Sequence, residues 1–169
     1  MLKLRLNVEL WDEIETSFPL SPRGETMPNE HQLVSSRLGR STPVTMVSII
    51  DDDEYAREAM GDLVQSLGYE VATFESAEHY LESGRLAETS CLITDLNMPG
   101  LNGLELQSRL NADGDSTPVI FVTAFPEERF RERAMSAGAV GFLGKPFDEN
   151  SLIHCLETAL TISPAEDEN

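Results

Sequence analysis

The chain has 169 residues, 40% of them hydrophobic, which is enough for one ordinary domain with its own core. Its formal net charge of −18 argues against nucleic acid or an anionic membrane surface as a direct partner of the folded part. No apolar run approaches the ~18 residues of a membrane span, and the N-terminus lacks a signal peptide's continuous apolar segment, so we expect a cytoplasmic protein.

Residues 1–45 differ in composition from the rest of the chain. They hold five Lys/Arg and six Asp/Glu, a net of −1, whereas residues 46–169 hold seven and twenty-four, a net of −17. We expect residues 1–45 to be a mostly disordered N-terminal extension, 46–162 to form the folded domain, and 163–169 to be an acidic tail. Met46 stands directly before the first predicted strand, and a further hypothesis is that the natural chain begins there.

From Val47 onward, short apolar runs alternate with segments whose apolar residues recur at helical spacing. Strands are predicted over Val47–Ile50, Tyr69–Phe74, Cys91–Thr94, Pro118–Val122 and Ala139–Leu143. Helices are predicted over Ala56–Leu67, from a cap at Ser76, near Gly103–Asn111, around Phe130–Ala137, and from a cap at Asp148. Gly68 and Gly138 are expected to end the first and fourth of these helices.

Five strand–helix units in succession favour one architecture. Continuous apolar strands alternating with amphipathic helices indicate a parallel sheet that is covered on both faces. Right-handed crossovers make this a doubly wound α/β domain with five parallel strands, (βα)5. Ligands of such folds bind at the carboxyl ends of the strands, so polar residues at those ends are the candidates for function.

Polar residues follow four of the five predicted strands. Asp51 and Asp52 come after the first strand and Asp95 after the third. Thr123 ends the fourth strand, and Lys145, the only lysine of residues 46–169, lies just beyond the fifth. Each of these alone is more often a loop or surface residue, but together they should converge at one edge of the sheet.

The residue types in this set point to one kind of chemistry. Clustered carboxylates raise one another's proton affinity, and a bound divalent cation reverses that effect. Oxygen ligands without His or Cys indicate a hard ion, and Mg²⁺ accepts a site with few carboxylates and several waters. A carboxylate beside Mg²⁺, a lysine and a hydroxyl has the groups that phosphoryl transfer needs.

With these motifs in view, the chain resembles the receiver domain of two-component response regulators, over roughly Val44 to Leu160. The segments that carry the resemblance are "IIDDDE", "LITDLNMPGLNG", "VIFVTA" and "AGAVGFLGKPF". In detail it is most similar to receivers that precede LuxR-type helix-turn-helix domains. The fold implied by this family is the flavodoxin-like five-stranded parallel sheet.

The resemblance implies a role for each residue around the acidic cluster. Asp95 matches the phosphoacceptor, and Asp52 matches the direct Mg²⁺ ligand. Asp51 matches the acid that usually holds the metal through water, and Asn97 matches the position whose backbone carbonyl coordinates it. Asp53 has no such match and is expected to be a solvated helix start.

The resemblance also implies a switch. Thr123 matches the hydroxyl that moves onto the phosphoryl group, and Lys145 matches the lysine that pairs with it. A cis bond is expected before Pro146. Phe142 matches an aromatic residue that turns inward when the threonine moves.

The function implied is that of a stand-alone receiver. It would take a phosphoryl group onto Asp95 from a sensor histidine kinase or a His-phosphotransfer protein, with Mg²⁺, and would catalyse only its own phosphotransfer and dephosphorylation. The signal would reach a partner protein, or a second copy of the chain, through the face that contains Phe142. One alternative is a phosphorelay intermediate that passes the phosphoryl group on. Another is a DNA-binding regulator without its output domain, since the nine residues after Leu160 cannot hold a helix pair.

Three arginines on the fourth predicted helix leave two interpretations open. Arg129, Arg131 and Arg133 follow Glu127 and Glu128, so they could pair with acidic neighbours on a solvated helix. They could equally form a contact patch for an acidic partner or for a second copy of the chain.

Other classes fit less well. An aspartyl-phosphate phosphatase favours an Asp-x-Asp nucleophile loop, whereas Asp95 is followed by Leu96 and Asn97. A flavin-binding domain would need a Ser/Thr/Gly-rich phosphate loop after the first strand, where acidic residues would repel a phosphate. Cys91 and Cys155 lack metal-ligand spacing and lie in apolar segments, so we expect reduced core thiols.

Overall fold

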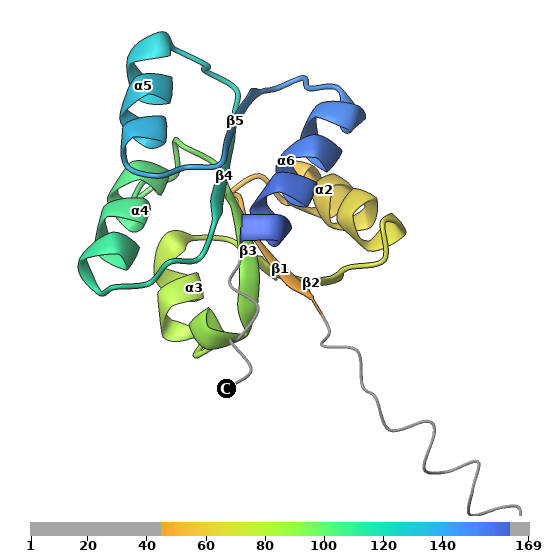
Figure 1. Cartoon of the computed structure of the whole chain (residues 1–169), viewed down its shortest axis with the longest axis horizontal. Coiled ribbons are helices and arrows are strands. Elements are labelled where there is room, and N and C mark those ends of the chain that lie inside the picture. Colours follow the sequence, from red (N-terminus) through yellow and green to blue (C-terminus); the bar gives the residue numbers. More distant parts are fainter. Residues whose placement is uncertain (1–44, 163–169) are drawn as a thin grey trace, which may run out of the picture. The chain divides into compact units, whose positions relative to one another are not determined.

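A computed structural model describes residues 45–162, in which five strands alternate with helices (Figure 1). The strands are β1 (Met46–Ile50), β2 (Glu70–Phe74), β3 (Thr89–Thr94), β4 (Val119–Thr123) and β5 (Gly141–Gly144). The helices are α2 (Glu54–Ser66), α3 (Ala77–Glu82), α4 (Gly103–Ala112), α5 (Glu128–Ser136) and α6 (Glu149–Ile162), with a short 3-10 turn over Leu86–Glu88. Residues 1–44 and the predicted acidic tail 163–169 lie outside the described residues.

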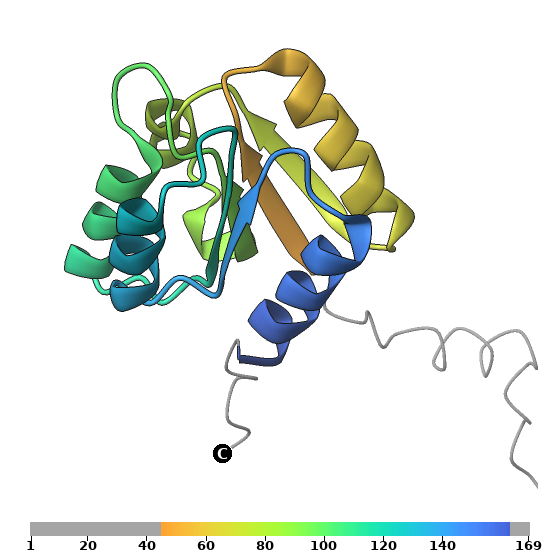
Figure 2. The same ribbon diagram turned by 90° about the horizontal axis from the view of Figure 1, so that it is seen from above.

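The strands form one parallel sheet in the order β2-β1-β3-β4-β5, which confirms the predicted doubly wound α/β fold. Helices α2 and α6 cover one face, and α3, α4 and α5 cover the other (Figure 2). Side chains of a strand point alternately to the two faces, so Ile49 packs against α2 and α6 while Ile50 packs on the opposite side. Burial on both faces explains why these strands are apolar throughout.

Local sequence signals set several helix ends where they were predicted. The side chain of Asp53 accepts a hydrogen bond from the Ala56 amide at 3.1 Å, so Asp53 begins α2 as a cap. Ser76 caps α3 in the same way. Gly68 and Gly138, with φ of 92° and 93°, follow the ends of α2 and α5 in a left-handed conformation that glycine adopts without strain.

Two strand boundaries differ from the prediction by two residues because of contacts between elements, and the other shifts are of one residue. Strand β3 begins at Thr89, two residues early, since Thr89 pairs with Met46 and its hydroxyl lies 2.8 Å from that of Ser48. Strand β5 begins at Gly141, two residues late, because the Ala139 amide donates to the Ala134 carbonyl at the end of α5. Neither contact is visible in the local apolar pattern.

Both cysteines are free, as expected, and pack between the sheet and helices α2 and α6. Burial raises the pKa of the Cys91 thiol to about 12, so it stays protonated and unreactive at neutral pH. Among residues 45–162, the helices are all too short or too polar to span a bilayer.

Replacing Gly141 tests the packing between β5 and α6. A Cβ at this position would lie 2.6 Å from Cys155 Sγ and 3.1 Å from Cys155 Cβ. We expect Gly141→Ala to lower the free energy of unfolding by about 1–3 kcal/mol through overpacking, measured by urea titration. The loss should shrink in a Cys155→Ala background, and an equal loss in both backgrounds would contradict this account.

Candidate functional site

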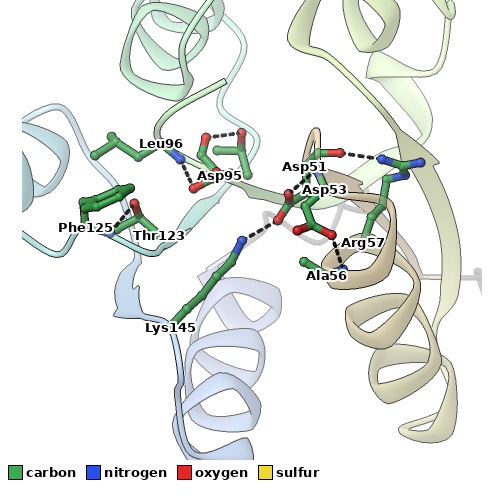
Figure 3. A network of polar contacts seen from close by, with 10 residues as sticks. Asp51, Asp53, Ala56, Arg57, Asp95, Leu96, Thr123, Phe125 and Lys145 are labelled. Carbon is green, nitrogen blue, oxygen red and sulfur yellow. Dashed lines mark hydrogen bonds and ion pairs between the residues drawn. The ribbon is translucent and has the colours of Figure 1, made fainter. Parts of the chain in front are cut away.

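Three carboxylates meet at the carboxyl edge of the sheet. This was predicted from their positions directly after the first and third strands. Oxygens of Asp51, Asp52 and Asp95 all lie within 4.8 Å of one another. Figure 3 shows two of the three, Asp51 and Asp95, with Lys145 beside them. The Asp95 amide donates to the Ile50 carbonyl at 2.8 Å, which extends the contact between β1 and β3 by one residue. Neighbouring parallel strands therefore bring Asp95 beside Asp51, although 44 positions separate them in the sequence.

Lys145 reaches the acidic cluster from the end of β5. Its ammonium Nζ lies 2.6 Å from Asp51 Oδ2, and the side chains are 22% and 2% exposed, respectively. The Lys145 amide donates to the Thr123 carbonyl at 2.7 Å, and the bond to Pro146 is cis, as the resemblance implied. The partner of Lys145 in this structure is thus Asp51.

Two further contacts hold Asp51 in place. The Asp53 amide donates to Asp51 Oδ1 at 2.9 Å, and the guanidinium of Arg57 donates to the Asp51 carbonyl at 2.6 Å. Sequence reasoning did not single out Arg57. The available signal was that residues 46–169 contain only seven basic residues and that Arg57 lies one turn into the helix that follows the acidic run.

Thr123 and Phe142 lie beneath the site. Thr123 is fully buried, and its hydroxyl oxygen accepts a hydrogen bond from the Phe125 amide at 3.2 Å. Phe142 is 6% exposed and packs on Phe121, with 6.1 Å between ring centroids. Phe142 therefore already occupies the inward position that the sequence interpretation assigned to the switched state.

Electrostatics single out Asp95 within the cluster. Burial raises the pKa of the Asp95 carboxyl above its usual value, Asp51 adds to this, and the Lys145 ammonium and the Leu96 amide oppose it. The Leu96 amide donates to Asp95 Oδ1 at 2.7 Å. Three carboxylates face one ammonium, so the cluster favours a cation.

The donor set fits Mg²⁺. All three side-chain donors are carboxylates, which suit a hard divalent ion, and Mg²⁺ needs only a few of them when waters complete its shell. Asn97 is exposed on the β3–α4 loop, two residues after Asp95. Its role as a carbonyl ligand stays a prediction.

The three arginines of α5 have different environments. Arg129 pairs with Glu127 at 2.8 Å and lies over the ring of Phe130. Arg131 donates to the Phe142 carbonyl at 3.2 Å and so links α5 to β5. Arg133 of α5 lines an open groove together with residues of α4, the β3–α4 loop and Glu78 of α3. Local pairing therefore accounts for Arg129, and Arg131 has a structural contact.

Asp95→Asn should stabilise the metal-free protein at pH 7. Because the pKa of Asp95 is raised in the folded state, that state binds its proton more tightly than the unfolded chain does, and wild-type stability falls as pH rises through this window. The asparagine carries no charge, so its advantage should shrink on acidification.

Thermal unfolding at several pH values measures this effect, with the exposed Asp62→Asn as the matched control. Saturating Mg²⁺ should reduce or reverse the difference at pH 7, since the cation stabilises the charged cluster. A variant that is less stable than wild type in metal-free buffer at pH 7 would refute this electrostatic account.

Comparison with known proteins identifies the family to which the domain is similar. Residues 47–157 match the response regulator receiver domain. Response regulator protein TmoT of Ectopseudomonas mendocina is 38% identical over 126 residues, which are 74% of this chain and 57% of that protein. Transcriptional regulatory protein FixJ of Azorhizobium caulinodans is 39% identical over 114 residues, 68% of this chain and 54% of FixJ.

A solved structure agrees with these matches. The response regulator StyR superposes with a TM-score of 0.66 at 41% sequence identity, over 70% of this chain and 60% of StyR. The chain thus spans little more than half the length of these curated relatives. The match over residues 47–157, with an acidic cluster at the carboxyl edge of a 2-1-3-4-5 sheet, means that the chain belongs to the response regulator receiver domain family.

Proposed function

We propose that this protein accepts a phosphoryl group on Asp95 and that the modified domain changes its affinity for a protein partner. The observation that carries the proposal is the cluster of Asp51, Asp52 and Asp95 oxygens within 4.8 Å, with the Lys145 ammonium 2.6 Å from Asp51. Such a cluster supplies an oxygen nucleophile, a cation site and a positive charge in one place.

In the proposed reaction an Asp95 oxygen attacks the phosphorus of a phosphohistidine on a sensor histidine kinase or a His-phosphotransfer protein. The phosphorus–nitrogen bond breaks, the histidine nitrogen takes the electron pair, and an acyl phosphate forms on Asp95. The Leu96 amide holds Oδ1, which leaves Oδ2 as the attacking atom. Water later hydrolyses the acyl phosphate and releases inorganic phosphate. The protein would thus catalyse only its own phosphorylation and dephosphorylation.

Asp51, Asp52 and Asp95 would hold Mg²⁺, together with the backbone carbonyl of Asn97. When bound, Mg²⁺ neutralises charge on the phosphoryl oxygens. The flexible side chain of Lys145 can leave Asp51 for a phosphoryl oxygen, because Asp51 then has the cation for a partner.

Thr123 couples this chemistry to the β4–α5 loop. Its hydroxyl keeps a proton that it can donate to a phosphoryl oxygen, and its oxygen accepts from the Phe125 amide. A movement of the hydroxyl towards Asp95 would lengthen that bond and release the loop. Since Phe142 is already buried, we assign the change to the β4–α5 loop, where Phe125 is 64% exposed.

The proposed output face consists of α5, β5 and α6. Arg131 joins α5 to the Phe142 carbonyl, so a shift of the β4–α5 loop would be carried to β5. Phosphorylation would then shift an existing equilibrium between two conformations of this face. Coupling of this kind between two sites is typically worth ~1–3 kcal/mol of partner binding free energy. The partner is a protein of another kind or a second copy of this chain.

The relatives favour a second candidate function. FixJ is named a transcriptional regulatory protein, and the chain spans 54% of it. The sequence could therefore represent the receiver part of a longer regulator whose output domain binds DNA. Mass measurement of the native gene product distinguishes this from a stand-alone receiver, and transfer from Asp95 to candidate His-phosphotransfer proteins tests the phosphorelay alternative.

Asp95 should be the only labelled residue when the protein is incubated with acetyl phosphate and Mg²⁺. Omitting Mg²⁺ should prevent labelling, and Asp52→Ala should weaken Mg²⁺ binding by at least about tenfold, because a charged oxygen donor is lost. Phosphate-affinity gels and calorimetry measure the two effects. Labelling that persists in Asp95→Asn would rule out the assignment, and Asp62→Asn should behave as wild type.

Beryllofluoride, which mimics a phosphoryl group, should change either the elution volume of the protein or its affinity for a captured partner. Phe142→Ala should abolish that response, because it removes the β5 side chain that packs against Phe121 of β4 on the face covered by α5. Tyr55→Ala removes an aromatic side chain that is 84% exposed on α2 and should preserve the response. An unchanged response in Phe142→Ala would show that the signal leaves by another route.

A further inference from the structure

The β3–α4 loop carries both Asp95 and the predicted carbonyl ligand Asn97, so its shape decides how the site is arranged. Its near end is fixed to the sheet. The Leu96 amide donates to Asp95 Oδ1 at 2.7 Å, and the Gly103 amide donates to the Leu96 carbonyl at 3.0 Å. A Cβ at Gly103 would overlap the Asp95 carbonyl, which means that the start of α4 lies against the phosphoacceptor's own backbone.

The far end of the loop is fixed by a residue from another element. Glu78, in the first turn of α3, accepts a hydrogen bond from the Leu101 amide at 2.8 Å through Oε1, across 23 residues of sequence. Gly100 has a φ of 76°, and a Cβ there would lie 2.6 Å from the same oxygen. The glycine therefore allows the loop backbone to approach the carboxylate closely.

The surroundings of the Glu78 carboxylate favour its ionised form. Its own amide and that of Leu101 lower the pKa of the Glu78 carboxyl, and the charge of Arg109 acts in the same direction. Its second oxygen, Oε2, is buried and has no hydrogen-bond partner among residues 45–162. The bond that Oε1 accepts from Leu101 is the contact that joins Glu78 to the β3–α4 loop.

We propose that Glu78 is a positioning residue for the acidic cluster. Its bond to Leu101, together with the bond from Gly103 to Leu96, confines the four intervening loop residues that include Asn97. Ligands of a metal depend on such outer partners for their orientation. This inference rests on the proposed function of the site and adds a residue that touches neither the metal nor the phosphoryl group.

Three substitutions of Glu78 separate its possible roles. Glu78→Gln keeps an oxygen that can accept from Leu101, Glu78→Asp keeps the charge but shortens the reach, and Glu78→Ala removes both. We expect Mg²⁺ affinity, measured by calorimetry, to fall about five- to tenfold in Glu78→Ala and Glu78→Asp and to stay within about twofold of wild type in Glu78→Gln. Glu82→Ala, an exposed acid of the same helix, is the matched control and should bind Mg²⁺ as wild type does.

A second measurement reports on the loop itself. Amide hydrogen exchange should show that Leu101 is protected in wild type and Glu78→Gln, and that it exchanges at least about tenfold faster in Glu78→Ala and Glu78→Asp. Thermal unfolding without Mg²⁺ checks that each variant is folded. If Glu78→Ala fails to fold, the comparison of Glu78→Asp with Glu78→Gln carries the test.

The outcomes also separate this inference from the proposed function. If wild-type Asp95 is not labelled while the Mg²⁺ and exchange differences appear, the proposed function fails and the positioning role stands. If wild type is labelled but Glu78→Asp matches it in Mg²⁺ affinity and Leu101 exchange, the positioning role is overturned. Equal losses in Glu78→Gln and Glu78→Ala would overturn it as well, because charge rather than the hydrogen bond would then be responsible.

Discussion

The repulsion between carboxylates at the ends of β1 and β3 is the constraint around which this site is organised. Asp51 and Asp95 directly follow two paired strands and Asp52 follows Asp51, so the backbone keeps the three carboxylates close, with oxygens within 4.8 Å of one another. Lys145 offsets one of the three negative charges, which leaves two. Burial makes the remaining charge more costly and raises the pKa of Asp95. A cluster of this kind favours any ligand that brings positive charge.

The fold can hold these carboxylates together against their repulsion because the sheet is buried on both faces. Helices α2 and α6 pack against one side and α3, α4 and α5 against the other, so each strand end is fixed by contacts along the whole strand (Figure 2). Functional side chains lie at the edge, where the strands leave the core. The packing that stabilises the core and the charge repulsion at the site therefore lie in different parts of the domain.

The loops at this edge are tied to the sheet and to the helices by a few polar contacts each. Arg57 holds the Asp51 carbonyl, Glu78 holds the Leu101 amide, and Thr123 holds the Phe125 amide. Each contact links one loop to one residue of a neighbouring element or strand end. A hydrogen bond contributes about 0.5–1.5 kcal/mol between neutral groups and about 1.5–3 kcal/mol to a charged one, so each of these contacts is weak enough to be exchanged if the charge at Asp95 changes.

Local patterns in the sequence were sufficient to determine the fold and the membership of the acidic cluster. Apolar runs that end in Asp51 and Asp95 located two strand ends, Gly68 and Gly138 located two helix ends, and the rule for parallel sheets brought the acids together. Lys145 stood out as the only lysine of residues 46–169. These predictions depend only on residue type and on the pattern of residues close together in the sequence.

Tertiary structure alone decided which side chains support the cluster and how they are arranged. The contact of Glu78 with Leu101 joins positions 23 residues apart, and the inward placement of Phe142 depends on the room left beside Phe121. The pairing of Lys145 with Asp51 depends on where β5 ends relative to β1. Such contacts follow from the packing of several elements at once, because a side chain's rotamer and partner are fixed only when its neighbours are in place.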